Sequence, residues 1–300
     1  MGDSPTTAGG QMAGSSLIQT IERWPLPVFV FLTVAVSWPA WGVLAVYDLE
    51  PGIDLAGVLW LLGGLGPPIA AVVVVGLSEG IRAVRQLLGR LVMWRVERRW
   101  YAVAILLPGT VVIAALIIDA LLYDLSTLLP SFGLLPLFIG SIVANMLIGG
   151  GLEEIGWRGF ALPRLQAEYS ALTASLLLGV VWIAWHAPLF VVPGAIQAEL
   201  SPLPFLIQGL ALAVVFTWLY NSTRGSLLLV VLLHGTVNAW LTSVWFLRGG
   251  VSSTTLWVFA GLLGVIAVCL VAVYGREHLS RHHRQVAVTA GSDKPAHRNG

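Results

Sequence analysis

Eight apolar runs, each long enough to cross a bilayer, are the feature that most limits how this chain can fold. They cover, approximately, residues 26–47, 55–77, 100–122, 134–152, 171–192, 203–220, 226–245 and 255–274. The hydrocarbon core of a bilayer is about 30 Å thick and needs about 20 residues of helix. Helices bond all of their backbone polar groups internally, as that environment requires. The sequence therefore predicts an all-α polytopic membrane protein with about eight transmembrane helices.

Composition agrees with this class. Of the 300 residues, 57% are hydrophobic and 10% are charged, and the chain contains 13 Trp. These values lie outside the range of ordinary soluble domains. We expect an integral protein of the cell membrane that contacts membrane lipids, and a net charge of +1 gives no indication of a nucleic-acid partner.

The polar segments divide the chain into one domain and two tails. Residues 1–22 are rich in small and polar residues and are predicted to form a disordered cytoplasmic tail. Residues 23–275 form the eight-helix membrane domain, whose motif-bearing core is 134–245. Residues 276–300 are polar and basic and are predicted to form a second disordered cytoplasmic tail.

The basic residues predict an orientation. With eight spans and the N-terminus inside, 15 of the 16 Lys and Arg residues fall on one side, and Arg248 alone falls on the other. The positive-inside rule then places both termini in the cytoplasm. The connection 80–99 carries six arginines and is predicted to lie at the interface, near anionic lipid headgroups.

Three charged residues follow the fourth apolar run, in the stretch Gly-Gly-Gly-Leu-Glu-Glu-Ile-Gly-Trp-Arg-Gly-Phe. Glu154 and Arg158 are four residues apart and can pair on one face of a helix, whereas Glu153 is turned about 100° away from Glu154. Ionisable residues at membrane depth are costly and usually functional. We therefore interpret this cluster as part of a site, with a purely structural network of ion pairs and hydrogen bonds as the alternative.

Two histidines lie within later apolar runs. His186 follows Trp182 by four residues, and His234 precedes Asn238 by four, so each pair shares one helix face. Polar groups stacked in this way must face a polar cavity and not lipid. Other polar residues in or near the spans are more consistent with structural roles; they are Asp119, Asn145 and Gln208.

These residue types suit the attack of water on an amide. A glutamate shielded from bulk water can take a proton from a water molecule, and a histidine can share that task. A second histidine and an asparagine amide can donate hydrogen bonds to the developing oxyanion. Serine and cysteine nucleophiles fit poorly, because Cys269 is far along the sequence and no serine stands in a Gly-x-Ser-x-Gly setting.

The motifs Glu-Glu-x-x-x-Arg, Trp-x-x-x-His and His-x-x-x-Asn, in this order on successive spans, resemble those of the CAAX protease and bacteriocin-processing family, also called the Abi family. The resemblance implies an intramembrane endopeptidase that acts near the C-terminus of a protein or peptide precursor, which is prenylated for the eukaryotic relatives. It implies that Glu153 is the catalytic glutamate and that Glu154 and Arg158 complete its motif. His186 would help to activate water, and His234 and Asn238 would stabilise the oxyanion. Trp182 stands where the family pattern usually has Phe.

The metal requirement stays open at this point. The family is commonly classed as metalloproteases, and Glu153, His186 and His234 could bind zinc together with one water. The His-Glu-x-x-His motif of ordinary zinc proteases is absent, and a glutamate-activated water accounts for Asn238 equally well. We favour a mechanism without a cofactor and keep zinc as the alternative.

The position of the site predicts a cavity that faces the cytoplasm. At 1.5 Å per residue, His186 lies about 22 Å into its span and His234 about 12 Å into its own. The two histidines can therefore meet only if the fifth helix begins well below the membrane surface or tilts steeply.

Two other functions remain: a proton- or cation-coupled transporter, and a non-catalytic immunity or scaffold protein. A transporter is less consistent with the sequence, because no internal repeat is visible and the polar residues cluster in one region.

Overall fold

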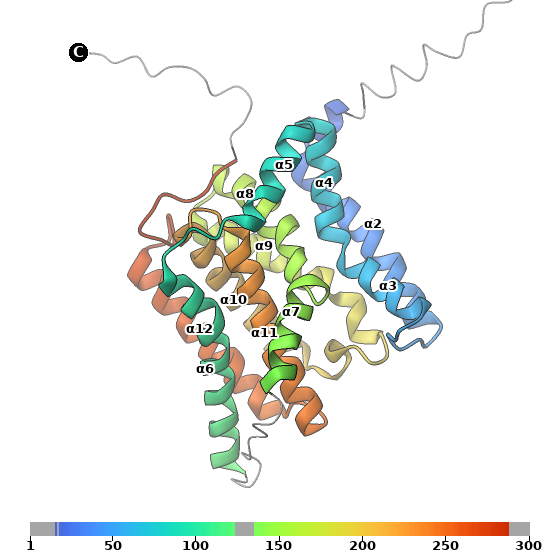
Figure 1. Ribbon diagram of the computed structural model, residues 1–300, viewed down its shortest axis with the longest axis vertical. Coiled ribbons are helices and arrows are strands. Elements are labelled where there is room, and N and C mark those ends of the chain that lie inside the picture. Colours follow the sequence, from blue (N-terminus) through green and yellow to red (C-terminus); the bar gives the residue numbers. More distant parts are fainter. Residues whose placement is uncertain (1–15, 17, 124–134, 288–300) are drawn as a thin grey trace, which may run out of the picture.

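The computed structural model describes residues 16, 18–123 and 135–287, and all regular structure in these ranges is helical. The remaining residues of the predicted tails, 1–15, 17 and 288–300, and the first residue of the predicted span 134–152 lie outside the described ranges. The long helices run up and down through one bundle (Figure 1). They are α2 (Pro25–Val46), α6 (Arg98–Leu122), α9 (Ala171–Trp185), α10 (Pro202–Ser222), α11 (Leu227–Arg248) and α12 (Ser253–Tyr274).

Two further spans are broken. Helix α3 (Leu55–Gly64) meets α4 (Gly66–Ser78) at an angle of 53°, and the segment formed by 137–153 and 155–168 bends by 42°. The first bend coincides with Gly66, Pro67 and Pro68, because proline lacks a backbone donor and interrupts the helical ladder. Six helices are long and apolar enough to cross a membrane, or up to eight if each bent pair is one span. This agrees with the prediction of about eight.

The core of the bundle is centred on α10. Its residues from Ala211 to Tyr220 are all buried, and it packs against α9 on one side and α12 on another. Helix α11 packs against α6 and against α7 (Leu135–Leu147), while α2 packs against α3 and α4. The segment 151–168 contacts α4 from the first group of helices and α11 from the second, so the glutamate motif lies between the two groups.

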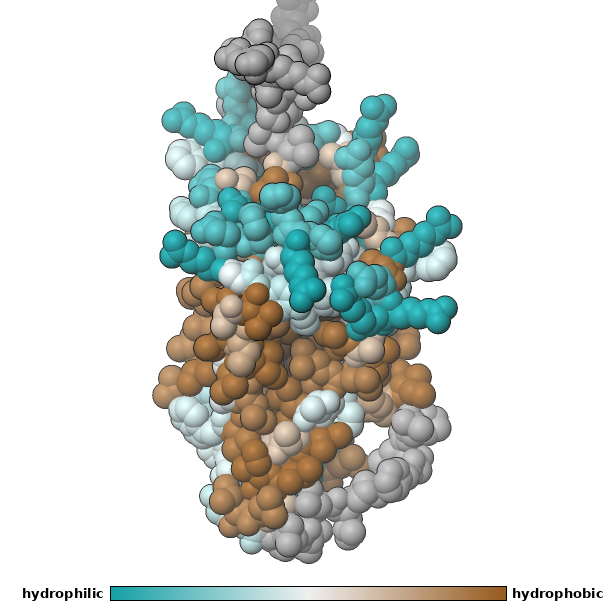
Figure 2. Space-filling view, turned by 90° about the vertical axis from the view of Figure 1, so that its left-hand side faces the viewer, coloured by the Kyte–Doolittle hydropathy of each residue, from teal (hydrophilic) through white to brown (hydrophobic). Residues whose placement is uncertain are grey.

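Polar side chains gather at one end of the bundle. In Figure 2 they form the hydrophilic upper part, and apolar side chains cover the part below it. That end carries the short helix α5 (Ile81–Gly89) and the arginines of the connection 80–99. We call it the basic end.

The beginning of the predicted C-terminal tail is ordered, which differs from our expectation. The backbone N–H of Ala171 donates to the carbonyl of Glu277 at 3.1 Å, and that of Ala287 donates to the carbonyl of Pro163 at 3.1 Å. Leu279 is fully buried. Residues 276–287 therefore pack against the basic end, because Leu279 has apolar surface to bury and the helix ends below supply hydrogen-bond partners. Residues 18–22 of the predicted N-terminal tail are likewise helical, and Ile21 is buried.

Candidate active site

The glutamate motif occupies an irregular helical segment. After α7, the chain turns at Gly150, whose φ of 105° is a left-handed value that favours glycine. A short 3₁₀ turn, Gly151–Glu153, leads into a π-helix, Ile155–Ala161, and then into α8 (Leu162–Glu168). All residues of the π-helix are buried. Turns of π-helix are rare and are frequently found at functional sites.

Glu154 and Arg158 form the predicted pair, in full burial. The Arg158 Nη1 atom lies 2.9 Å and 3.0 Å from the two carboxylate oxygens of Glu154, and neither side chain is exposed. The same carboxylate contacts the Nδ1 atom of His234 at 2.7 Å. Glu154 thus joins the first and third motifs, and it fixes the orientation of the His234 ring.

Aromatic rings enclose the Arg158 guanidinium. It lies 4.6 Å from the centroid of Phe216 and 5.3 Å from that of Trp182. The ring of His234 stacks on the same Phe216 at 5.3 Å. A cation over a ring face is attracted to it, most strongly in the absence of water. These aromatic rings pack around the ion pair and fix its position next to the site.

Glu153 points in a different direction, as its position one residue before Glu154 predicts. Its Oε2 atom accepts hydrogen bonds from the indole N–H groups of Trp182 at 2.9 Å and Trp157 at 3.3 Å. The side chain is almost completely buried. Two N–H donors on one oxygen fix the carboxylate and leave Oε1 directed at the cavity described below.

His186 is held by the end of its own helix. Its Nδ1 atom lies 2.7 Å from the carbonyl oxygen of Trp182. A carbonyl oxygen only accepts hydrogen bonds, so Nδ1 must carry the proton, and the neutral ring then presents an unprotonated Nε2. The ring contacts those of Trp182 and Trp185 edge to face.

Three polar atoms, one from the 3₁₀ turn and two from α11, converge beside Gly150. A Cβ atom added there would lie 2.9 Å from Asn238 Nδ2, 3.0 Å from Glu153 Oε1 and 3.0 Å from His234 Nε2. The Asn238 Nδ2 group also donates to the Gly149 carbonyl at 2.5 Å. Glycine at this position keeps the space between these groups open, which the sequence alone did not indicate.

These groups open onto a cavity of about 420 Å³. Four of the predicted site residues line it, namely Glu153, His186, His234 and Asn238, whereas Glu154 and Arg158 lie behind the wall. Asn145 and Gln208, which we predicted to be structural, line the cavity as well. Asp119 does not, and it pairs with Arg248 at 3.5 Å. The indole of Trp157 and the ring of Phe216 were not predicted, because apolar neighbours alone do not distinguish them from ordinary core residues.

The cavity extends away from the basic end. Its outer walls come from Pro51, from Gly194 and Gln197, and from Phe246 near the end of α11. By contrast, the π-helix and the buried part of α10 separate it from the arginine-rich connection. The two predictions, a cytoplasmic basic end and a cavity that faces the cytoplasm, therefore cannot both hold. Both histidines line one cavity, but their depths in the spans did not determine where it opens.

The zinc ligands considered above do not form a metal site in this arrangement. In the described ranges, no group of three His, Cys, Asp or Glu side chains lies close enough together to hold a metal ion. Glu153 Oε2 and Nδ1 of each histidine are bonded within the protein, so Glu153 Oε1 and the two Nε2 atoms are the atoms that a metal would have to reach. No step below is assigned to a metal.

The part of the chain that carries this site is similar to known proteins. Residues 135–240 match the model of the family described as Type II CAAX prenyl endopeptidase Rce1-like. The chain is similar to CAAX prenyl protease 2 of Methanococcus maripaludis, with 34% identity over 99 residues. That match covers 31% of this chain and 36% of the relative's length. The family match contains all three motifs, so the likeness to Rce1-like endopeptidases lies in the part of the chain that carries the site, and the chain matches about a third of the relative's length.

Proposed function

We propose that this chain is an intramembrane endopeptidase that hydrolyses a peptide bond with water activated by Glu153. The observation that supports it best is the convergence of a carboxylate oxygen, an imidazole nitrogen and an amide nitrogen beside Gly150. A base and two potential oxyanion partners within about 3 Å of one point are the arrangement that amide hydrolysis needs. The match of residues 135–240 to the Rce1-like family supports the same reaction class.

Glu153 is the general base in this mechanism. Its Oε1 atom takes a proton from a water molecule, and the water oxygen attacks the carbonyl carbon of the peptide. His186 presents its unprotonated Nε2 to the same cavity and accepts a hydrogen bond from that water. The proton held by Glu153 then passes to the leaving amine as the carbon–nitrogen bond breaks. The products are a carboxylic acid and an amine, and the base is regenerated.

Asn238 and His234 stabilise the oxyanion. The Asn238 amide uses one N–H for the Gly149 carbonyl and keeps a second for the oxyanion. His234 donates to the oxyanion through Nε2, so Nε2 carries a proton. The hydrogen bond between Nδ1 and Glu154 needs a second proton, which is carried by the ring or by the carboxylate. Arg158 pairs with Glu154 and holds its carboxylate against Nδ1 of His234.

The substrate fits the cavity as an extended peptide with apolar side chains. Aromatic residues supply much of the wall, including Trp41, Trp60, Trp185 and Phe205. The relative from M. maripaludis is a CAAX prenyl protease by its name. We infer a protein or peptide precursor as the substrate, with a prenyl group as one form of its apolar part, and an orientation with both termini in the cytoplasm.

The experiment is the cleavage of a fluorogenic peptide library by the full-length protein in lipid nanodiscs. Glu153→Gln keeps the shape of the side chain but cannot take a proton, and we expect a loss of at least about 10²-fold in turnover. His234→Ala should also lose turnover. Glu168→Gln, at an exposed position of α8, is the matched control and should keep wild-type activity. Undiminished turnover by Glu153→Gln would overturn the assignment.

The same assay decides the question of the metal. We expect turnover to survive incubation with phenanthroline, because the proposed steps use side chains and water alone. Loss of turnover with the chelator, restored by added zinc, would overturn the metal-free mechanism while leaving the endopeptidase activity in place.

A further inference from the structure

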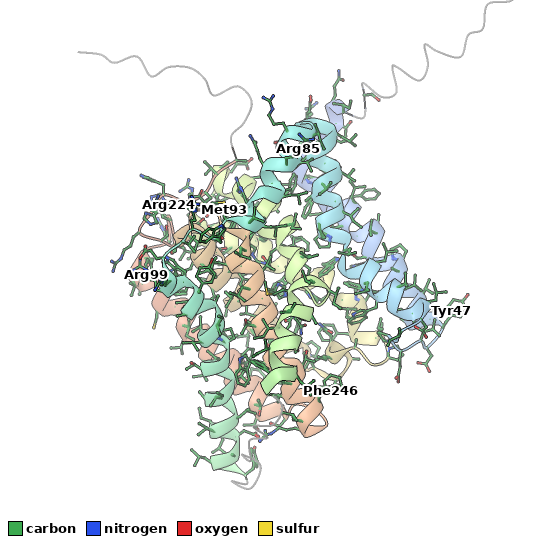
Figure 3. All side chains as sticks on the ribbon, viewed as in Figure 1. Tyr47, Arg85, Met93, Arg99, Arg224 and Phe246 are labelled. Atoms are coloured by element: carbon green, nitrogen blue, oxygen red, sulfur yellow. The ribbon has the colours of Figure 1, made fainter. Side chains whose placement is uncertain are left out.

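The charges on the two ends of the bundle differ sharply. Arg85 and Arg224 lie at the basic end and Phe246 at the opposite end, as Figure 3 shows. In the described ranges, the connections of the opposite end carry one basic residue, Arg248, which pairs with Asp119 at 3.5 Å. Positive charge is retained on the cytoplasmic side of membrane proteins. The opposite end is therefore the non-cytoplasmic end.

The cavity belongs to that non-cytoplasmic end. Pro51 comes from the connection that follows α2, Gly194 and Gln197 come from the connection that follows α9, and Phe246 comes from the last turn of α11. All three elements end on the side away from the arginines. Phe246 is 73% exposed, so the wall of the cavity continues to the surface there.

The basic end offers no comparable entrance to the site. Trp157, Arg158 and Phe160, in the π-helix that follows the glutamates, have no exposed surface. Leu227 and Leu229, at the start of α11, are also completely buried. A peptide from the cytoplasm would have to displace this packed layer, which protein interiors resist because they are close-packed.

The rim of the cavity is acidic. Glu50 precedes the cavity residue Pro51, and its side chain lies 3.5 Å from the position of a Cβ added to the cavity residue Gly194. Glu199 lies beside Trp245 of the cavity wall and accepts its indole N–H at 2.6 Å. Asp48 and Asp54 are exposed in the same connection as Glu50. No Lys or Arg is among the described residues that line the cavity.

We propose that the cavity admits a peptide segment from the non-cytoplasmic side of the membrane, and that its acidic rim favours a segment with a basic residue next to its apolar part. This inference rests on the proposed function for its substrate, but the direction of access stands on the structure and the charge distribution.

Cysteine labelling tests the direction without any need for catalysis. The single cysteine is replaced by Cys269→Ser, and one new cysteine is placed at the rim (Ala198→Cys), in the cavity wall (Thr242→Cys) or at the basic end (Arg85→Cys). Intact cells are treated with a membrane-impermeant thiol reagent. We expect the first two positions to react in intact cells and the third only after permeabilisation. The reverse pattern, or a cavity position that reacts only after permeabilisation, would overturn the inference.

Charge selection is tested with pairs of quenched peptides that differ only by Lys or Gln at one position. They are added outside spheroplasts, which exposes them to the non-cytoplasmic end alone. Wild type should cleave the Lys peptide with the higher kcat/KM, and Glu50→Gln should reduce that preference by about twofold to fivefold, the effect of one exposed charge pair. An unchanged preference would overturn the role of the rim. Absence of cleavage both outside spheroplasts and by the protein in nanodiscs would contradict the proposed function, and the labelling would still decide the direction of access.

Discussion

Gln208 is a buried polar residue that the predicted catalytic set did not include. It lies on α10, lines the cavity and is only 4% exposed, and its Oε1 atom has no hydrogen-bond partner. A buried acceptor without a partner costs about 1–3 kcal/mol, so a protein keeps one for a reason. A peptide in the cavity offers backbone N–H groups that can supply the missing bond. We therefore expect Gln208 to position the substrate.

The variant Gln208→Leu tests this role. Leucine has a similar size and no acceptor, so we expect KM for a peptide substrate to rise about fivefold to tenfold, from the loss of about 1 kcal/mol of hydrogen bonding, with kcat nearly unchanged. The thermal midpoint should not fall, because no bond within the protein is lost. Gln166→Leu is the contrasting control: Gln166 bonds to Asn221 and to the Gln285 carbonyl, so this change should lower the midpoint. A fall in kcat with KM unchanged for Gln208→Leu would contradict a positioning role.

The sequence identified residues whose chemistry is unusual for their surroundings. Glu153, His186, His234 and Asn238 could be found because charge and polarity are rare in apolar runs, and their spacing placed them on helix faces. Gly150, Trp157 and Phe216 could not be found, because their roles depend on which elements meet. Gln208 and Asn145 were predicted to be structural because each stands outside the three motifs. The packing of α10 and α7 around one cavity shows that both line it.

At the level of elements, the π-helix Ile155–Ala161 decides how the glutamate motif works. A regular helix was expected, and it places Glu154 and Arg158 on one face. The wider turns keep this pair together while Glu153, in the preceding 3₁₀ turn, faces the cavity. Two adjacent carboxylates thus have different environments, one paired with a cation and one bonded to two indoles. The sequence predicted this division but not the backbone that produces it.

Breaking the buried pair should destabilise the fold. The variant Arg158→Met leaves the Glu154 carboxylate without its cation, and we expect a loss of about 3–5 kcal/mol in unfolding free energy. Unfolding by a denaturing detergent, followed by circular dichroism, measures it. Adding Glu154→Gln to this variant removes the uncompensated charge and should recover most of the stability, but not the turnover, because His234 loses its charged partner. Recovery of both would mean that the pair has a structural role alone.

The whole molecule is best understood from the asymmetry of its two ends. The number of spans and the helical class followed from the length and apolarity of the runs, which the bilayer dictates. The relation between the basic end and the cavity did not follow, because sequence periodicity does not show which end of a bundle is packed and which is hollow. The buried π-helix closes one end, and the connections 47–54 and 192–201 surround the opening at the other.

The arginines of the basic end should bind the protein to anionic lipid. Arg82 and Arg85 are exposed on α5, which Val84 and Leu87 attach to the bundle on the opposite face of the helix. A basic residue near an anionic surface contributes about 1 kcal/mol, and the effect weakens with salt. We expect the thermal midpoint to be higher in nanodiscs with anionic lipid than in zwitterionic ones. The double variant Arg82→Gln and Arg85→Gln should lose part of this difference, and high salt should reduce it for wild type. An equal difference for the variant and wild type would show that α5 does not contact the headgroups, and that the charge asymmetry serves orientation alone.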